Sequence, residues 1–239
     1  MAHTQTPDTQ LVSLTAPASF AAEQYQGLRL AVERLARTRE ARVIAVSSPA
    51  AGDGKTVTAI NLAGALARGS SARVLLIDAD LRRPAVAKQI GLEDAEVGLA
   101  DALGNGIPIE RIIRTLDRFN LAVIPAGTAR AGVSQLLRSP RVEELIREAR
   151  QRYDYVVLDT PPLLPVFDSA LLAKSVDGVL LVVSANQTPR KLLGEALNLL
   201  DASKVLGIVF NRDDRPLFGY YDAYYREYFP EASHAAGKA

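Results

Sequence analysis

The sequence predicts an α/β fold in which a mostly parallel β-sheet is flanked by helices on both faces. Across residues 40–212, short apolar runs rich in β-branched residues alternate with helical segments. Most of these runs are apolar throughout, which is typical of strands that are buried on both faces. No internal repeat and no Pro/Gly-rich linker interrupts this region, so we expect a single domain of ordinary globular composition.

The elements follow in chain order. Residues 1–19 are rich in Thr, Pro, Ala and Gln, and we expect them to form a flexible leader. A helix is expected over residues 20–39, where Leu28, Val32 and Leu35 share one narrow apolar face. The expected strands are residues 42–47, 73–78, 121–125, 153–159, 178–184 and 205–211. The expected helices between them are residues 56–68, 141–152 and 190–201, and residues 213–239 are expected to be a flexible, Tyr-rich tail.

The composition limits the chemistry that this protein can perform. Its 239 residues contain 28 Lys and Arg and 27 Asp and Glu, a net charge of +1, so we expect no nucleic acid among its partners. The sequence has no cysteine, and its two histidines, His3 and His234, lie in tail-like segments. Thiol chemistry and cysteine zinc sites are therefore excluded, and histidine-centred catalysis is disfavoured. Carboxylates, lysine, arginine, hydroxyls and backbone amides remain.

The sequence favours a cytoplasmic protein. Its first 22 residues hold no Lys or Arg and no long apolar core, unlike a secretory signal. The strongly apolar runs, such as residues 178–183, are far shorter than the ~20 residues that a membrane-spanning helix needs.

A phosphate-binding loop is predicted at residues 47–56, which read SSPAAGDGKT between a strand and a helix. Glycines let backbone N–H groups turn inward around phosphates, and the helix that follows adds its positive N-terminal end. Lys55 would supply charge at the β- and γ-phosphates, and the Thr56 hydroxyl is a typical Mg²⁺ ligand. Pro49 stands where the usual pattern has a small residue, so the loop is a deviant Walker A motif. The alternative is a glycine-containing turn with an incidental lysine. The candidate nucleotide-binding residues of the loop are Gly52, Asp53, Gly54, Lys55, Thr56 and Val57.

Three aspartates follow expected strands. Asp78 and Asp80 come at the end of one buried strand, and Asp159 ends another. Ligands of open α/β sheets bind at the carboxyl ends of the strands, so these residues should converge on the loop. Carboxylates there can hold Mg²⁺ or accept a proton from an attacking hydroxyl. The alternative is that they cap helices and form turns.

Together these motifs resemble the bacterial tyrosine kinases (BY-kinases) of capsular and exopolysaccharide synthesis, which belong to the P-loop NTPases. The family pattern φφφDxDxR reads LLIDADLR at residues 75–82, and φφφDxxP reads VVLDTPP at residues 156–162. The resemblance spans roughly residues 20–229. It implies an ATP-dependent protein-tyrosine autokinase that regulates capsule or exopolysaccharide synthesis and export, with a P-loop kinase domain over residues 20–212.

The resemblance also implies roles for single residues. Lys55 would hold the β/γ-phosphates of ATP, and Asp80 would be the base toward a tyrosine hydroxyl. Thr56 and Asp78 would hold Mg²⁺, with Asp159 acting through water. Arg82 and Arg83 would lie near the phosphates or an incoming subunit, and Asn211 and Arg212 would border the adenine. The implied catalytic residues are Lys55, Asp78, Asp80 and Asp159, and the implied cofactors are ATP and Mg²⁺.

The tail carries five of the eight tyrosines, and the resemblance implies their phosphorylation by a neighbouring subunit. The alternative is an aromatic tail that packs on its own core or on a partner. The candidate phosphoacceptors are Tyr220, Tyr221, Tyr224, Tyr225 and Tyr228.

The resemblance implies partners as well. The family's oligomerisation motif E-x-x-R-x-x-R occurs at residues 23–29, with Glu23 and Arg29 as candidate contacts, but Gln26 replaces the first arginine. We therefore expect a monomer or a weak self-association. A membrane-embedded chain-length regulator or activator and an opposing tyrosine phosphatase are the other implied partners. The activator would hold the protein at the inner face of the plasma membrane.

Two other functions remain open. Partitioning and cell-division-site ATPases share this core, but they usually carry a lysine five residues before the P-loop lysine, where this chain has Ala50. The alternatives are such an ATPase switch, or a non-catalytic nucleotide-binding regulator of polysaccharide export. ATP turnover and tail phosphotyrosine distinguish the three.

Overall fold

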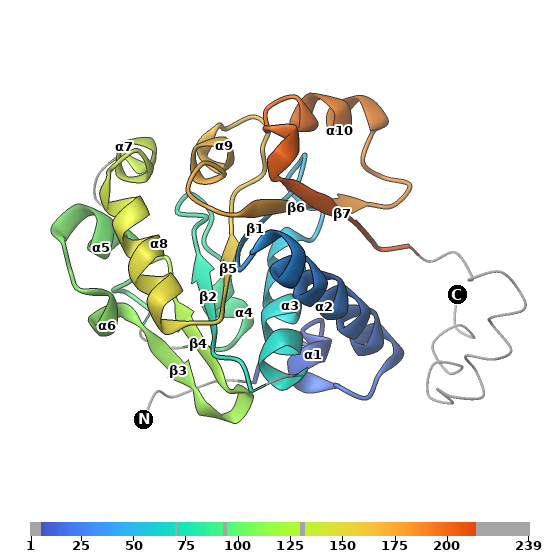
Figure 1. Ribbon diagram of the computed structural model, residues 1–239, viewed down its shortest axis with the longest axis horizontal. Coiled ribbons are helices and arrows are strands. Elements are labelled where there is room, and N and C mark those ends of the chain that lie inside the picture. The colour runs from blue at the N-terminus through green and yellow to red at the C-terminus, as the bar shows by residue number, and fades with distance from the viewer. Residues whose placement is uncertain (1–5, 70, 93–94, 130–131, 214–239) are drawn as a thin grey trace, which may run out of the picture.

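The computed structural model describes residues 6–69, 71–92, 95–129 and 132–213. In this part of the chain, seven strands form one sheet in the order β3-β4-β2-β5-β1-β6-β7 (Figure 1). All neighbouring strands are parallel except the pair β3 and β4. The predicted fold class is therefore confirmed. The strands are β1 (Val43–Ser47), β2 (Val74–Asp78), β3 (Arg114–Leu116), β4 (Leu121–Ile124), β5 (Tyr155–Asp159), β6 (Gly178–Ser184) and β7 (Val205–Asn211).

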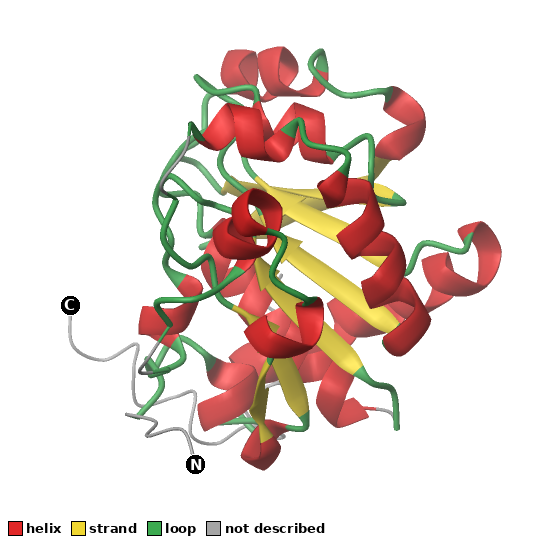
Figure 2. Ribbon diagram, turned by 90° about the vertical axis from the view of Figure 1, so that its left-hand side faces the viewer, coloured by secondary structure: helices red, strands yellow, loops and turns green. Residues whose placement is uncertain are grey.

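Helices cover both faces of this sheet, as the views in Figures 1 and 2 show. Helices α1 to α4 pack on one face, and α5 to α9 pack on the other. The α-helices are α1 (Val12–Thr15), α2 (Phe20–Arg39), α3 (Lys55–Gly69), α4 (Val86–Gln89), α5 (Leu99–Asn105), α6 (Ile109–Ile112), α7 (Val133–Leu137), α8 (Arg141–Arg152), α9 (Asp168–Leu172) and α10 (Arg190–Leu197). Two 3₁₀ turns, η1 (Asp117–Phe119) and η2 (Ala202–Lys204), precede β4 and β7.

The strands contribute to two separate cores because successive side chains point to opposite faces. In β1, Val43 and Ala45 join the core under α5 to α9, whereas Ile44 and Val46 join the core under α1 to α4. All four are almost fully buried. Both faces of the central strands are buried, so these strands need apolar residues at every position. This explains why apolar and polar residues do not alternate along them.

The expectation of a flexible leader is wrong for its second half. Leu11 is fully buried, and the backbone N–H of Ser13 donates to Asn61 Oδ1 at 2.9 Å. Leu14 lies over Gly64 of α3, where a Cβ would come within 2.7 Å of Leu14 Cδ2. The glycine makes room for the leader, and buried Asn61 holds its backbone through a second bond, to the carbonyl of Gln10 at 3.0 Å.

The remaining differences concern short elements. The antiparallel edge strand β3 and the short helices α4, α5, α6, α7 and α9 were not expected from the sequence. Helix α10 ends at Leu197 rather than near Asp201. No helix in the described ranges is both long and apolar enough to cross a membrane. Residues 214–239, which hold the five tail tyrosines, lie outside the described residues.

The topology places the predicted motifs together. Strands β2, β5 and β1 are neighbours in the sheet and run in the same direction. Asp78 and Asp159 are the last residues of β2 and β5 and lie side by side in register. The loop that precedes α3 follows directly from β1, and β6 and β7 end on its other side.

Candidate active site

The loop after β1 depends on two glycines. Gly52 and Gly54 both have a φ of +93°, in the left-handed region that favours glycine. At Gly54 a Cβ would also come within 2.0 Å of Asn211 Nδ2, so a larger residue there would have to displace the Asn211 side chain. This backbone directs the start of α3, including Lys55 and Thr56, toward the ends of β2 and β5.

Asp53 is one of the predicted nucleotide-binding residues, and the structure shows that its carboxylate braces the loop. One oxygen accepts from the backbone N–H of Ala50 at 3.1 Å, and the other accepts from the Thr188 hydroxyl at 2.7 Å. Asn211 Nδ2 donates to the Asp53 carbonyl at 2.9 Å. Sequence reasoning missed Thr188, because nothing local marks a residue 135 positions away as a loop contact.

Lys55 lies between two carboxylates. Its Nζ is 2.9 Å from Asp80 Oδ2 and 3.4 Å from Asp159 Oδ1, and its side chain is only 12% exposed. Burial alone would lower the pKa of the ammonium, but the charges of Asp159 and Asp80 outweigh burial and raise it. The lysine is therefore a fixed positive charge at neutral pH.

Asp159 is a fully buried carboxylate of the site. Its Oδ2 accepts from the Thr56 hydroxyl at 2.7 Å. Burial raises the pKa of Asp159 to about 6, although the Lys55 charge and the Thr56 hydroxyl act in the opposite direction. Thr56 and Asp159, predicted from separate motifs, are thus in direct contact.

Asp78 is held by backbone groups. Its Oδ2 accepts from Ala85 N at 3.1 Å and from Val86 N at 3.0 Å, and its Oδ1 accepts from Asp80 N at 3.2 Å. Burial, followed by the charge of Asp159, raises the pKa of Asp78 to about 7. Asp78 therefore shapes the turn after β2 besides contributing a carboxylate to the site.

These groups fit a magnesium ion that is bound together with phosphates. The Thr56 hydroxyl and the carboxylates of Asp78 and Asp159 are hard oxygen donors, which Mg²⁺ prefers. In the described ranges, no group of three or more His, Cys, Asp or Glu residues forms a metal-binding cluster by itself. This agrees with the usual Mg²⁺ site, where one or two carboxylates are completed by substrate phosphates and water.

The raised pKa values predict how pH affects stability. Asp78 and Asp159 bind protons more tightly in the folded protein than at their ordinary pKa of 3.8, so stability falls as pH rises toward about 7. Thermal unfolding of the nucleotide-free protein should show a midpoint that decreases between about pH 5 and about pH 8. Among the described residues, the other carboxyls with shifted pKa values have lowered ones and titrate below this interval; they are Glu110, Asp154, Asp177 and Asp201.

Asp78→Asn should flatten this dependence, because it removes the carboxyl with the higher pKa. Mg²⁺ with ADP should stabilise the wild type most at the alkaline end, where the carboxylates are ionised. A midpoint that rises with pH, or an unchanged slope in the variant, would contradict the prediction.

The other predicted site residues are placed as follows. Val57 is half-buried in the first turn of α3, and Asn211 lies against Gly54 at the end of β7. Arg212 is exposed, with a φ of +57°, and its Nη1 donates to Gln187 Oε1 at 3.5 Å. An adenine contact by Asn211 or Arg212 stays a prediction.

The candidate oligomer contacts lie on α2. Glu23 is exposed, whereas the Arg29 guanidinium is used within its own chain. It donates to Gln26 Oε1 at 2.9 Å, to Glu33 Oε1 at 2.9 Å and to the Gly69 carbonyl at 3.1 Å. A role of Glu23 and Arg29 in assembly stays a prediction.

This chain is similar to a family model and to several known proteins. The family model described as "AAA domain" matches residues 41–202. Tyrosine-protein kinase YwqD of Bacillus subtilis is 35% identical over 203 residues, which cover 84% of this chain and 85% of YwqD. Succinoglycan biosynthesis transport protein ExoP of Rhizobium meliloti is 37% identical over 215 residues, which cover 88% of this chain but only 27% of ExoP.

A solved structure matches the fold over nearly the whole chain. The kinase domain of the Escherichia coli tyrosine kinase ETK has a TM-score of 0.80 and 26% identity, and the match covers 90% of this chain and 86% of that domain. The match shows that this chain has the fold of that kinase domain.

Proposed function

This chain belongs to the bacterial tyrosine-protein kinase family, and on that premise we propose that it transfers the γ-phosphoryl group of ATP to protein tyrosines. The observation that carries the proposal is the Asp80 carboxylate, which lies 2.9 Å from the Lys55 ammonium at the mouth of a phosphate-binding loop. A group that binds phosphate and a group that accepts a proton are thus adjacent, as transfer to a hydroxyl requires.

Each group has a defined part in the reaction. Backbone N–H groups of the loop and the Lys55 ammonium hold the phosphates, and Thr56, Asp78 and Asp159 would hold the Mg²⁺ that neutralises them. The tyrosine oxygen attacks the γ-phosphorus while the bond from that phosphorus to the β,γ-bridging oxygen breaks. The phenolic proton passes to Asp80, and ADP leaves. Positioning and electrostatic stabilisation, rather than covalent chemistry, supply most of the rate.

We propose the tail tyrosines of a neighbouring subunit as the acceptors. The proposal is supported by the five tyrosines within residues 220–228, which are flanked by Asp222 and Glu227. Leu30 is 57% exposed on α2, the helix that carries Glu23 and Arg29, and gives this helix an apolar contact for a second copy. Because Arg29 is already bonded within its own chain, the self-association should be weak.

We also propose a regulatory setting. The relative ExoP is named for succinoglycan biosynthesis and transport, so control of exopolysaccharide or capsule synthesis and export is the process that we propose for this kinase. A membrane-embedded chain-length regulator would activate it at the inner face of the plasma membrane, and a tyrosine phosphatase would reverse its modification.

The kinase proposal is tested by mixing two variants with Mg²⁺ and ATP. One subunit carries Lys55→Met and keeps its tyrosines, and the other is active but has its five tail tyrosines replaced by phenylalanine. We expect phosphotyrosine on residues 220–228 of the inactive subunit, detected by mass spectrometry. Phosphate would reach it only from its neighbour.

Each other result has a distinct meaning. Labelling of wild type at every dilution, with no phosphate on the Lys55→Met subunit, would show that each chain modifies itself. ATP hydrolysis without phosphotyrosine would favour the ATPase switch. Nucleotide binding without any turnover would favour a non-catalytic regulator.

A further inference from the structure

The Arg82 side chain, two residues after Asp80, is bound to residues of α7 and α9. Its Nε donates to Asp168 Oδ2 at 2.5 Å, and its Nη2 donates to Asp168 Oδ1 at 3.4 Å and to the Ser134 hydroxyl at 2.9 Å. The Ser134 hydroxyl in turn donates to Asp168 Oδ1 at 2.9 Å. We call this group, Arg82 with Asp168 and Ser134, the arginine clamp.

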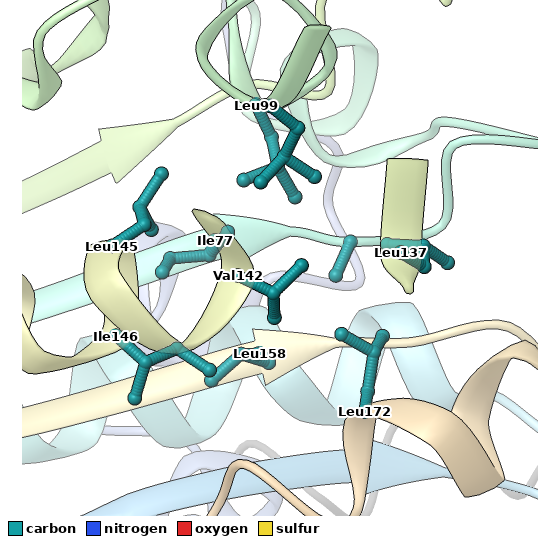
Figure 3. A pocket seen from close by; sticks show the side chains of 10 residues that line it. Ile77, Leu99, Leu137, Val142, Leu145, Ile146, Leu158 and Leu172 are labelled. Carbon is teal, nitrogen blue, oxygen red and sulfur yellow. The ribbon is translucent and has the colours of Figure 1, made fainter. Parts of the chain in front are cut away.

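Asp168, the ion-pair partner of Arg82, is buried, and Ser134 is half-buried. Asp168 begins α9 and Ser134 lies in α7, and the Asp168 side chain is only 3% exposed. Figure 3 shows Leu137 of α7 and Leu172 of α9 facing a common apolar cavity with Ile77 of β2. The cavity measures about 10 Å³ and holds no more than a single water, so the helices pack closely on the strand ends. Asp168 is therefore held in place by its surroundings. The Arg82 side chain is 40% exposed and is positioned by its bonds to Asp168 and Ser134.

The clamp acts on Asp80 through the intervening turn. Asp80 Oδ1 accepts from the backbone N–H of Arg83 at 3.0 Å, while Asp80 Oδ2 contacts Lys55 Nζ at 2.9 Å. Two residues, Leu81 and Arg82, lie between Asp80 and Arg83. The side chain of Arg82 is bound to a residue distant in the sequence, Asp168. Fixing Arg82 thus fixes the Arg83 N–H, and this bond sets the direction of the Asp80 carboxylate.

We propose that Asp168 is a positioning residue for phosphoryl transfer, which holds Asp80 in its reactive orientation through Arg82. This inference rests on the proposed kinase function. A bidentate guanidinium–carboxylate pair is well suited to the task, because its two hydrogen bonds fix orientation as well as distance. Ser134 completes the clamp by satisfying Asp168 Oδ1 and Arg82 Nη2 together.

The test compares Asp168→Asn and Arg82→Ala with a matched control. The control is Arg150→Ala, which removes an ion pair of 2.6 Å between Arg150 and Asp177. The Arg150 side chain is 40% exposed, as is that of Arg82. Full-length variants would be assayed with Mg²⁺-ATP and the Lys55→Met subunit as acceptor. We expect kcat to fall roughly 10- to 100-fold in both clamp variants. KM for ATP and the affinity for a fluorescent ATP analogue should stay within about twofold.

A double variant tests whether the pair acts as one unit. Combining Arg82→Ala with Asp168→Asn should cost no more in kcat than either change alone, whereas independent effects would multiply. A clamp variant that loses kcat, nucleotide affinity and thermal stability together, or no more kcat than Arg150→Ala loses, would overturn the inference.

Amide hydrogen exchange separates this inference from the kinase proposal. In Asp168→Asn, residues 79–86 should exchange faster than in the wild type, while the loop at residues 48–55 is unchanged. Unchanged exchange at residues 79–86 would overturn the clamp even if the kinase is active. A wild type that forms no phosphotyrosine would instead refute the proposed function, and faster exchange would then still support the clamp.

Discussion

Lys55→Met should abolish phosphoryl transfer, with a loss on the order of 100-fold or more in kcat. The ammonium is the only side-chain cation within residues 47–56, and it lies within 3.4 Å of both Asp80 and Asp159. Methionine has a similar length but no charge, so it removes the interaction with the phosphates and leaves the loop backbone in place. Phosphotyrosine formed per minute from Mg²⁺-ATP is the measurement.

The control is Lys191→Met, which changes an exposed lysine of α10 in the same way. It should keep full activity. Thermal unfolding of both variants checks that the loss does not come from unfolding, because Lys55→Met also leaves two buried carboxylates without their cation. Full activity in Lys55→Met would refute the phosphate-binding assignment of the loop.

Asp80→Asn should slow transfer by about 10²- to 10⁴-fold while nucleotide binding stays nearly intact. A base acts only in the chemical step, so its loss appears in kcat rather than in affinity. Asparagine can still accept from the Arg83 N–H, which preserves the turn. By contrast, Asp159→Asn removes the negative charge beside the Thr56 hydroxyl and should weaken Mg²⁺-dependent nucleotide binding, and Asp78→Asn should do the same.

Affinity for the nucleotide, measured with and without Mg²⁺, distinguishes the roles. Loss of affinity to the same extent in all three variants would show that the aspartates act only as a metal-binding group. An Asp80→Asn variant with unchanged kcat would mean that another group accepts the proton.

The central strands were predictable because they are apolar and buried on both faces, and the half-buried edge strand β7 was predictable from its apolar run. Residues 178–184 and 205–211 were predicted as strands with the bounds that β6 and β7 have. The three-residue strand β3 and helices of four to seven residues were missed, since they are too short to show a periodicity. The docked leader was missed for a related reason. Its apolar residues Leu11, Val12 and Leu14 form too short a run to show a periodicity, and their docking depends on the distant residues Asn61 and Gly64 of α3.

The candidate site was predictable where residues of a suitable chemical type stand at a recognisable spacing in the sequence. The glycines, Lys55 and Thr56 form a local motif, and the aspartates follow recognisable strands. The contacts of Thr188 with Asp53 and of Asp168 with Arg82 join residues 135 and 86 positions apart, which no local pattern reveals. A charged residue within the largely apolar stretch 163–172 was the single available signal for Asp168.

The contact of one ammonium with two buried carboxylates couples the binding of nucleotide to the binding of a metal ion. When phosphates draw the Lys55 ammonium toward themselves, Asp80 and Asp159 are left as neighbouring negative charges in a region of low dielectric. At neutral pH that arrangement is costly unless another cation enters at the same time. Nucleotide and divalent metal should therefore arrive as a pair, each compensating for the charge that the other displaces, and free nucleotide should be a poor ligand.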